Sequence, residues 1–248
     1  MKSETVEIRT TDGPANAYLA RPDGGAHPGV LFISDAYGLR STMSSMAGRA
    51  PVDALLGPSK GPRPASAFRA VLPLIQELTP ARIIGDGGAY LEYLESLAAP
   101  GPVAVTGFCM GGRLAWRIAA AYPGRVAALA AFHTAGLVTD TPDSPHRSAA
   151  DLGPVEAYFG FADQDQGMTP EQIATLEQAL ESAGVRYVAE IYEGAGHGYA
   201  VADSQAYDEA AAERQADELR ALLARTLRQV RRPAGRHGDD VTPAKGDP

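Results

Sequence analysis

The only cysteine of this 248-residue chain lies in a glycine-flanked pattern that suits a nucleophile. Cys109 is the middle residue of Gly-Phe-Cys-Met-Gly, with a short apolar run at residues 103–105 before it and an amphipathic stretch at residues 113–122 after it. A strand, a sharp turn and a helix in this order form a nucleophile elbow, whose apex side chain lies exposed above a helix N-terminus. This position favours a thiolate, whereas the alternative for a lone cysteine is a buried structural role.

A histidine and two aspartates further along the chain are candidates to activate this thiol. His197 lies among glycines in Glu-Gly-Ala-Gly-His-Gly-Tyr after one apolar run, and Asp163 and Asp165 follow another. A thiol nucleophile needs a base to take its proton and a third group to orient that base. The chain order cysteine, aspartate, histidine fits this requirement. The residues alone leave either aspartate open as the acid, and a solvated loop residue is the alternative for His197.

The remaining candidates for chemistry give weaker patterns. His133 follows the apolar run at residues 127–132 and is a candidate for the same site, with an ordinary hydrogen-bonded loop histidine as the alternative. Asp163 and Asp165 are too few ligands for a metal site, and the sequence contains no His-x-x-x-His pair. It also contains neither Gly-x-Gly-x-x-Gly nor a phosphate-binding lysine motif. We therefore expect chemistry without a cofactor or a metal.

Alternating strand and helix patterns predict the scaffold that positions these residues. Residues 6–10 and 15–21 indicate a hairpin. Further strands are expected at residues 29–34, 103–105, 127–132, 155–160 and 186–192, and helices at residues 113–122, 170–183 and 205–228. This alternation is typical of a doubly wound, mostly parallel sheet, in which the site lies beyond the carboxyl ends of the strands. Asp35, Cys109 and His197 all follow such ends.

One segment does not fit this scaffold. Residues 48–86 contain six prolines, and only residues 68–78 show helix-like spacing. Proline removes a backbone donor and is excluded from central strands. A doubly wound sheet requires a strand between residues 32 and 103, so we predict an irregular segment and a sheet that lacks a strand or leaves an edge uncovered.

Composition limits the classes of function. The length suits one α/β domain, which we assign to residues 1–230, and residues 231–248 have the composition of a disordered tail. A net charge of −8 argues against a nucleic-acid partner. A single cysteine allows no internal disulfide, and no signal segment or membrane-spanning run is found. We expect a cytoplasmic protein with no membrane partner, whose oligomeric state the sequence leaves open.

With these motifs the chain resembles the dienelactone hydrolase (carboxymethylenebutenolidase) family of α/β-hydrolases. The similar segments are residues 29–40, 103–117, 155–180 and 186–207, and cysteine in place of the usual serine at the apex makes the match specific. The resemblance implies the α/β-hydrolase fold and a small-molecule lactone or ester as substrate. It implies Cys109 as nucleophile and His197 as base. It favours Asp165 as the acid, because an apolar residue and a proline follow the acid in this family.

The same resemblance implies further residues around the thiol. The backbone N–H groups of Ala36 and Met110 would form the oxyanion hole, and Asp35 would contact the resting thiol. The expected pocket also contains Tyr37, His133 and Tyr199. Well-known members hold a substrate carboxylate with an arginine shortly after the histidine, but the residues around Val201 offer none. The alternative function is a catalytically inactive protein of this fold that binds a small ligand or a partner.

Overall fold

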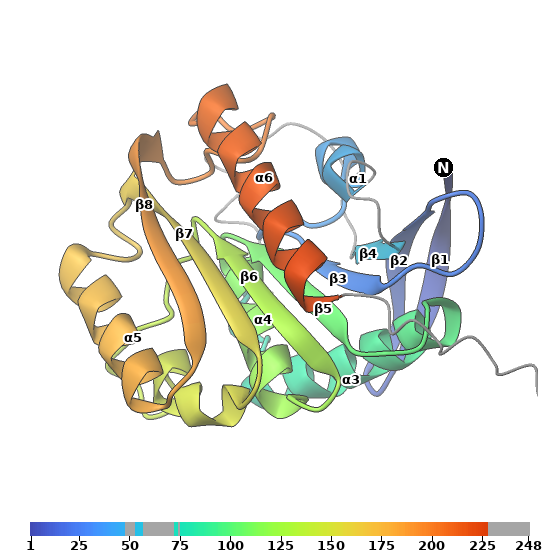
Figure 1. Ribbon diagram of the computed structural model, residues 1–248, viewed down its shortest axis with the longest axis horizontal. Coiled ribbons are helices and arrows are strands. Elements are labelled where there is room, and N and C mark those ends of the chain that lie inside the picture. The colour runs from blue at the N-terminus through green and yellow to red at the C-terminus, as the bar shows by residue number, and fades with distance from the viewer. Residues whose placement is uncertain (48–52, 57–71, 74, 228–248) are drawn as a thin grey trace, which may run out of the picture.

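An eight-stranded sheet forms the centre of the computed structural model, which describes residues 1–47, 53–56, 72–73 and 75–227 (Figure 1). The strand order is β1-β2-β4-β3-β5-β6-β7-β8. The strands are β1 (Lys2–Thr10), β2 (Gly13–Arg21), β3 (Gly29–Ile33), β4 (Asp53–Leu56), β5 (Val103–Phe108), β6 (Val126–Phe132), β7 (Glu156–Gln164) and β8 (Arg186–Gly196). β2 pairs antiparallel with β1 and β4, and the other neighbours are parallel. The expected doubly wound, mostly parallel sheet is confirmed.

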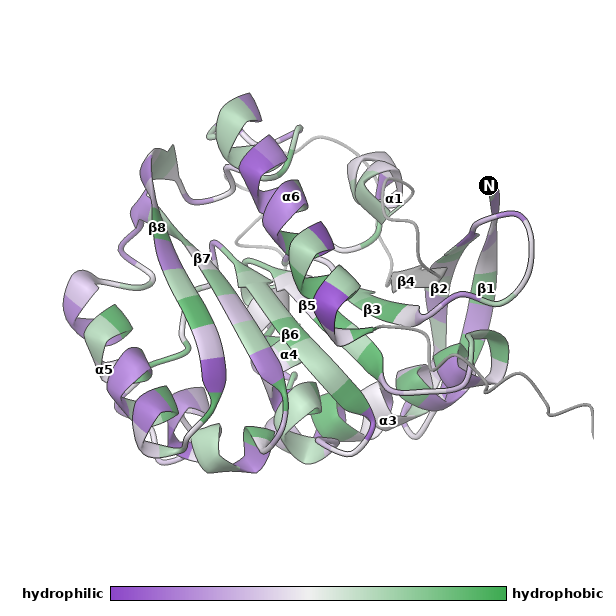
Figure 2. Cartoon of the chain, viewed as in Figure 1, coloured by the Kyte–Doolittle hydropathy of each residue, from purple (hydrophilic) through white to green (hydrophobic). Residues whose placement is uncertain are grey.

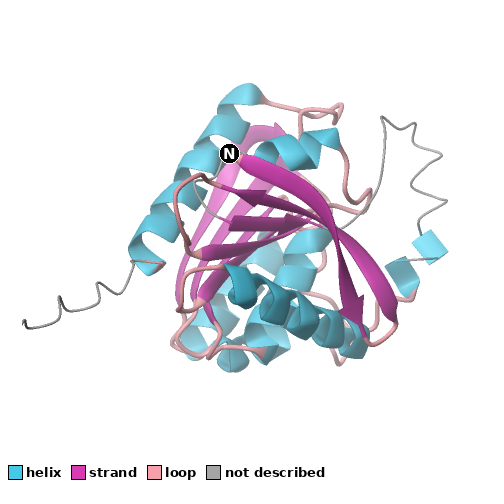
Figure 3. Cartoon of the chain, turned by 90° about the vertical axis from the view of Figure 1, so that its right-hand side faces the viewer, coloured by secondary structure: helices cyan, strands magenta, loops and turns pink. Residues whose placement is uncertain are grey.

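Helices cover both faces of this sheet (Figures 1 and 3). One face carries α3 (Pro80–Leu97), α4 (Met110–Ala121), α5 (Pro170–Ser182) and the 3-10 helix η1 (Pro145–Leu152); the other carries α1 (Ser41–Ala47) and α6 (Glu209–Thr226). Each layer has its own apolar cluster, because parallel strands bury both of their faces. Figure 2 shows apolar residues along the central strands and polar residues on α5 and α6.

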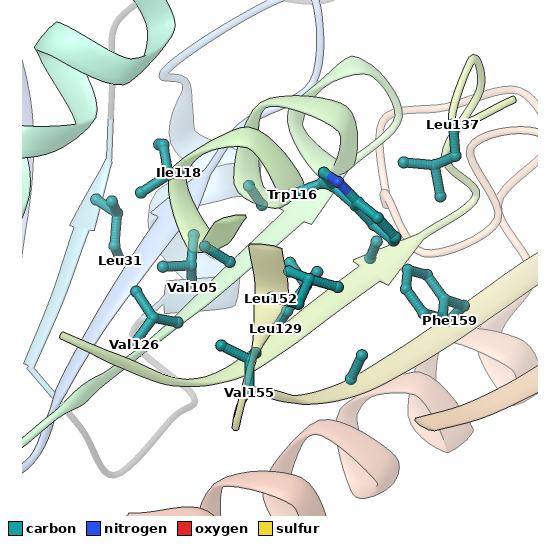
Figure 4. Packing of buried hydrophobic residues seen from close by; sticks show 14 of the residues in the cluster. Leu31, Val105, Trp116, Ile118, Val126, Leu129, Leu137, Leu152, Val155 and Phe159 are labelled. Atoms are coloured by element: carbon teal, nitrogen blue, oxygen red, sulfur yellow. The ribbon is translucent and has the colours of Figure 1, made fainter. Parts of the chain in front are cut away.

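The larger cluster packs α4 against the middle of the sheet (Figure 4). Trp116 of α4 is fully buried, and its ring centroid lies 5.9 Å from that of Phe159 on β7. The indole N–H donates to the hydroxyl of Ser148 at 3.0 Å, so burial leaves no polar atom of this side chain unpaired. This packing fixes α4, whose first residue follows Cys109.

The prediction that the sheet lacks a strand is wrong. β4 lies between β2 and β3, where Leu55 pairs with Leu19 on one side and with Leu31 on the other. The strand has only four residues, and Pro51 and Pro58 flank it in the sequence without entering it. The prolines of this segment therefore do not prevent a strand, because residues 53–56 contain none.

The sequence interpretation also missed α3, which begins inside the same segment. Thr79 caps this helix by accepting a hydrogen bond from the N–H of Arg82, and Pro80 occupies its first turn. Three glycines weaken its helical pattern, although its buried residues keep helical spacing: Ile83, Gly87, Leu91 and Leu94. The rest of the predicted irregular segment, and the predicted tail at residues 231–248, lie outside the described residues.

Candidate active site

The elbow between β5 and α4 holds Cys109 in an unusual backbone conformation. Its φ of 55° and ψ of −124° lie in a region that residues with a side chain rarely adopt. A Cβ on Gly107 would lie 2.1 Å from the carbonyl oxygen of Gly111, and a Cβ on Gly111 would lie 2.3 Å from that of Ser34. These glycines therefore allow α4 to approach β3 and β5 closely. The strained backbone angles are those of Cys109 itself.

Three side chains from different strand ends form one hydrogen-bonded row. Nε2 of His197 lies 3.0 Å from Sγ of Cys109, and Nδ1 of His197 lies 2.6 Å from Oδ2 of Asp165. The other carboxylate oxygen of Asp165 accepts from the N–H of Gly167 at 2.8 Å. Asp163 lies apart from this row, because its carboxylate accepts from the N–H of Gly194 at 3.0 Å and is exposed. Of the two candidate acids, the structure thus brings Asp165 to the histidine.

The charges in this row support one another. Burial opposes a charge on His197, but the hydrogen bonds to Asp165 and Cys109 outweigh it and raise the pKa of His197 to about 10. Burial also opposes the charge on Asp165, whose pKa nevertheless falls below its ordinary value because His197 and Gly167 donate hydrogen bonds to it. An imidazolium beside a thiol stabilises the thiolate, which is the reactive form of cysteine. The row therefore has the arrangement that nucleophilic attack by a thiol requires.

A cavity of about 720 Å³ opens above the thiol. Its wall includes Cys109, His197, Tyr37, Ala36 and Met110. Met110 is the first residue of α4, and the first N–H groups of a helix have no acceptor within the helix. The amides expected to form an oxyanion hole thus belong to residues on the same wall as the thiol.

His133 lies on the cavity wall beside His197. It is 1% exposed, and its ring centroid lies 5.2 Å from that of His197, nearly at a right angle. Burial, followed by the nearby charge of His197, lowers the pKa of His133 to about 3, so this imidazole stays neutral. Neither ring nitrogen has a hydrogen-bond partner among the described residues. Among the described residues, Cys109 and His133 are the two with positive φ that are not glycine.

Asp35 differs from the expectation that it contacts the thiol. Each of its carboxylate oxygens accepts a hydrogen bond from Arg40 at 2.7 Å, and one also accepts from the N–H of Tyr37 at 2.9 Å. The hydrogen bond of the thiol is with His197 instead. An arginine only five residues away gives Asp35 a cationic partner, and such charge-assisted hydrogen bonds are among the strong ones.

Tyr199 is a core residue, contrary to the prediction that it lines the pocket. It is fully buried, and its hydroxyl donates to the carbonyl of Gly160 at 3.1 Å. Its ring stacks on Tyr192 at 4.9 Å and meets the ring of His133 at 5.2 Å. Tyr199 is not among the described residues of the cavity wall, and its ring packs against His133, which is. A tyrosine packs readily in this way, because it has an apolar body and one polar atom, which here has a partner.

The cavity wall also includes Arg40 and Asp203, which are not among the predicted site residues. They are joined by an ion pair of 2.6 Å, although 163 positions separate them in the chain. The nearest sequence signal was an arginine five residues after an acid in the loop that follows β3. Within the described ranges, no group of three or more histidine, cysteine or acidic side chains is placed to hold a metal ion. No helix of the same ranges is long and apolar enough to cross a bilayer.

Comparison with known proteins gives the family of this chain. A family model described as "Dienelactone hydrolase family" matches residues 15–227. A Salmonella typhimurium protein named "Putative carboxymethylenebutenolidase" is 29% identical over 220 residues, which cover 79% of this chain and 77% of that protein. Among solved structures, a "Putative Dienelactone Hydrolase" from Klebsiella pneumoniae has a TM-score of 0.80 at 20% identity, covering 90% of this chain and 98% of its own.

A thermostable carboxylesterase cloned from a metagenomic library has a TM-score of 0.64 at 16% identity, covering 90% of this chain and 89% of its own. At such identities the two solved structures show the α/β-hydrolase fold alone. The family model covers most of the chain, and its description names the family. The chain belongs to the dienelactone hydrolase family and is a hydrolase of the α/β-hydrolase fold.

Proposed function

We propose that this protein hydrolyses a lactone or small ester through Cys109, His197 and Asp165 by way of a thioester. The observation that carries the proposal is the hydrogen-bonded row, in which His197 joins Sγ of Cys109 at 3.0 Å and Oδ2 of Asp165 at 2.6 Å. The row ends in a cavity of about 720 Å³, a size that suits a small molecule. Membership of the family supports the same reaction.

In the first half of the reaction, the thiolate of Cys109 attacks the carbonyl carbon and forms a carbon–sulfur bond. The carbonyl oxygen takes up the negative charge, and the N–H groups of Ala36 and Met110 stabilise it. Such a donor is typically worth about 3–4 kcal/mol. When the carbon–oxygen bond breaks, the imidazolium of His197 gives its proton to the leaving oxygen. In a lactone the resulting alcohol stays attached to the acyl group.

In the second half, neutral His197 takes a proton from water, and the hydroxide attacks the thioester carbon. The carbon–sulfur bond then breaks, the acid leaves, and the thiolate and imidazolium return. Asp165 stabilises the imidazolium and fixes the tautomer of His197 in both halves. Tyr37 and His133 belong to the substrate pocket, where a neutral imidazole can hydrogen-bond an uncharged oxygen.

The test compares wild type with Cys109→Ala on p-nitrophenyl acetate and a small aliphatic lactone. We expect turnover by wild type, an acetyl adduct on Cys109 in mass spectra of quenched reactions, and no turnover by Cys109→Ala. His146→Gln is a suitable control, because His146 lies in η1, bonds to the hydroxyl of Ser144 and is not among the described residues of the cavity wall. A Cys109→Ala variant that keeps several per cent of the activity would disprove the proposal. Binding of these compounds without turnover by wild type would favour the inactive binding protein.

A further inference from the structure

Arg40 uses every N–H donor of its guanidinium inside the cavity wall. Its Nε donates to Asp203 at 2.6 Å. One terminal nitrogen donates to Asp35 at 2.7 Å and to the carbonyl of Gly38 at 3.2 Å. The other terminal nitrogen donates to Asp35 at 2.7 Å and to Asp203 at 3.0 Å. The side chain is only 5% exposed. A guanidinium carries five donors in a rigid fork, so Arg40 has none left for a substrate.

The two carboxylates that Arg40 joins belong to different loops of the site. Asp35 directly precedes Ala36, and it fixes the turn around that residue by accepting the N–H of Tyr37. Asp203 lies in the loop that begins with His197 and leads to α6. In the sheet, β3 is on one side of β5 and β8 lies on the other, so these loops reach Cys109 from opposite sides. Arg40 is the link between them.

The cluster holds the guanidinium of Arg40 and the carboxylate of Asp35 away from water, and the carboxylate of Asp203 lies at its exposed edge. Burial opposes the charge of Arg40, but the hydrogen bonds to Asp35 and Asp203 outweigh it and raise the pKa of Arg40. Burial also opposes the charge of Asp203, and the bond from Arg40 brings the pKa of this carboxyl below its ordinary value. Without the guanidinium, the buried carboxylate of Asp35 would be left without a cation beside the carboxylate of Asp203, which is strongly unfavourable. The loops would separate to let water reach them.

We propose that Arg40 is a positioning residue that holds the amide of Ala36 and the imidazole of His197 at a fixed separation across Cys109. Arg40 has no hydrogen bond with the thiol or the imidazole among the described contacts, so it acts through the two loops. The inference rests on the proposed function, because both positioned groups have a task only in that reaction. A buried ion pair is weak evidence for stability, and fixing one arrangement is its better-attested use.

The test measures kcat and KM for the same ester and lactone with Arg40→Gln and Arg40→Lys. We expect Arg40→Gln to lower kcat about 100-fold with KM unchanged, the usual effect of moving catalytic groups by about 1 Å. Lysine keeps the charge but has three donors, so Arg40→Lys should fall between wild type and Arg40→Gln. The control is Arg125→Gln. Arg125 directly precedes β6 and makes two hydrogen bonds to Glu95, at 2.9 and 2.8 Å, so its replacement breaks a similar ion pair and should leave kcat unchanged.

A merely structural role would lower the melting temperature of Arg40→Gln while each folded molecule kept the wild-type kcat, and that result would overturn the inference. If Arg40→Gln does not fold, Asp203→Asn removes one of the two links at a position that is 24% exposed. A folded Asp203→Asn variant with wild-type kcat would equally overturn it. Because the residues act as one unit, adding Asp203→Asn to Arg40→Gln should slow the reaction no further. The turnover of wild type and Cys109→Ala is measured in the same series. If Cys109→Ala keeps its activity, the proposed reaction has failed, and this outcome differs from a failure of the role of Arg40.

Discussion

Replacing Asp165 with asparagine should almost abolish catalysis, and the structure gives the reason. The N–H of Gly167 donates to Oδ1 of Asp165 at 2.8 Å, so the amide oxygen of an asparagine must stay at this position. Its NH2 group then faces Nδ1 of His197, where Oδ2 now lies at 2.6 Å. Nδ1 must accept this hydrogen bond, and the ring proton moves to Nε2. In that tautomer His197 cannot take the proton of Cys109.

A histidine held in the wrong tautomer lowers kcat by roughly 10⁴, which corresponds to about 5.4 kcal/mol of transition-state stabilisation. The substitution also removes the anion that helps to raise the pKa of His197. Steady-state rates on p-nitrophenyl acetate measure the loss, and circular dichroism checks that the variant is folded. The matched control is Asp163→Asn, since Asp163 bonds only the exposed N–H of Gly194 and should change kcat less than about threefold. A loss below tenfold for Asp165→Asn, or a larger loss for Asp163→Asn, would refute the assignment.

Three further predictions follow from the same site. The raised pKa of His197 stabilises the fold fully below pH 6.5 and progressively less as pH rises to about 10. In urea unfolding, the free energy of unfolding should therefore fall more between pH 6.5 and pH 9 for wild type than for His197→Gln. Neutral esters should be hydrolysed at least as fast as carboxylate-bearing ones, because all donors of Arg40 are taken. A preference for anions that disappears in Arg113→Gln, the other arginine of the described cavity wall, would contradict this. Gly111→Ala should yield little soluble protein, because its Cβ would lie 2.3 Å from the carbonyl oxygen of Ser34; soluble, active Gly111→Ala would show that α4 can shift.

The residues of the hydrogen-bonded row could be found from the sequence, because each follows a strong apolar run and lies near glycines. The choice between Asp163 and Asp165 needed the family resemblance, since both follow the same strand. Geometry then separates them: the carboxylate of Asp163 binds the end of β8, while that of Asp165 turns toward His197.

The errors have physical causes of their own. β4 is too short to show a pattern, and α3 contains glycines that mask its periodicity. The partner of Asp35 could not be predicted from spacing, because Asp35 and Arg40 lie in one irregular loop, where side chains follow no period. Tyr199 was misplaced because the sequence does not show which way its side chain turns, and in the structure it turns into the core. The assignment of residues 1–230 to a single domain, and the cytoplasmic location, stay predictions.

The shortness of β4 has a consequence for how the molecule opens. Among the described residues, three pairs join β4 to β2 and three join β4 to β3, so this part of the chain links the β1–β2 hairpin to the parallel sheet along a narrow seam. Segments with few long-range backbone bonds open at lower free energy than the core around them. Pulled from its N-terminus, or exchanging amide protons in heavy water, the chain should therefore release the hairpin first. Cys109, Asp165 and His197 all follow strands beyond that seam, so the reacting groups would outlast the loss of the hairpin.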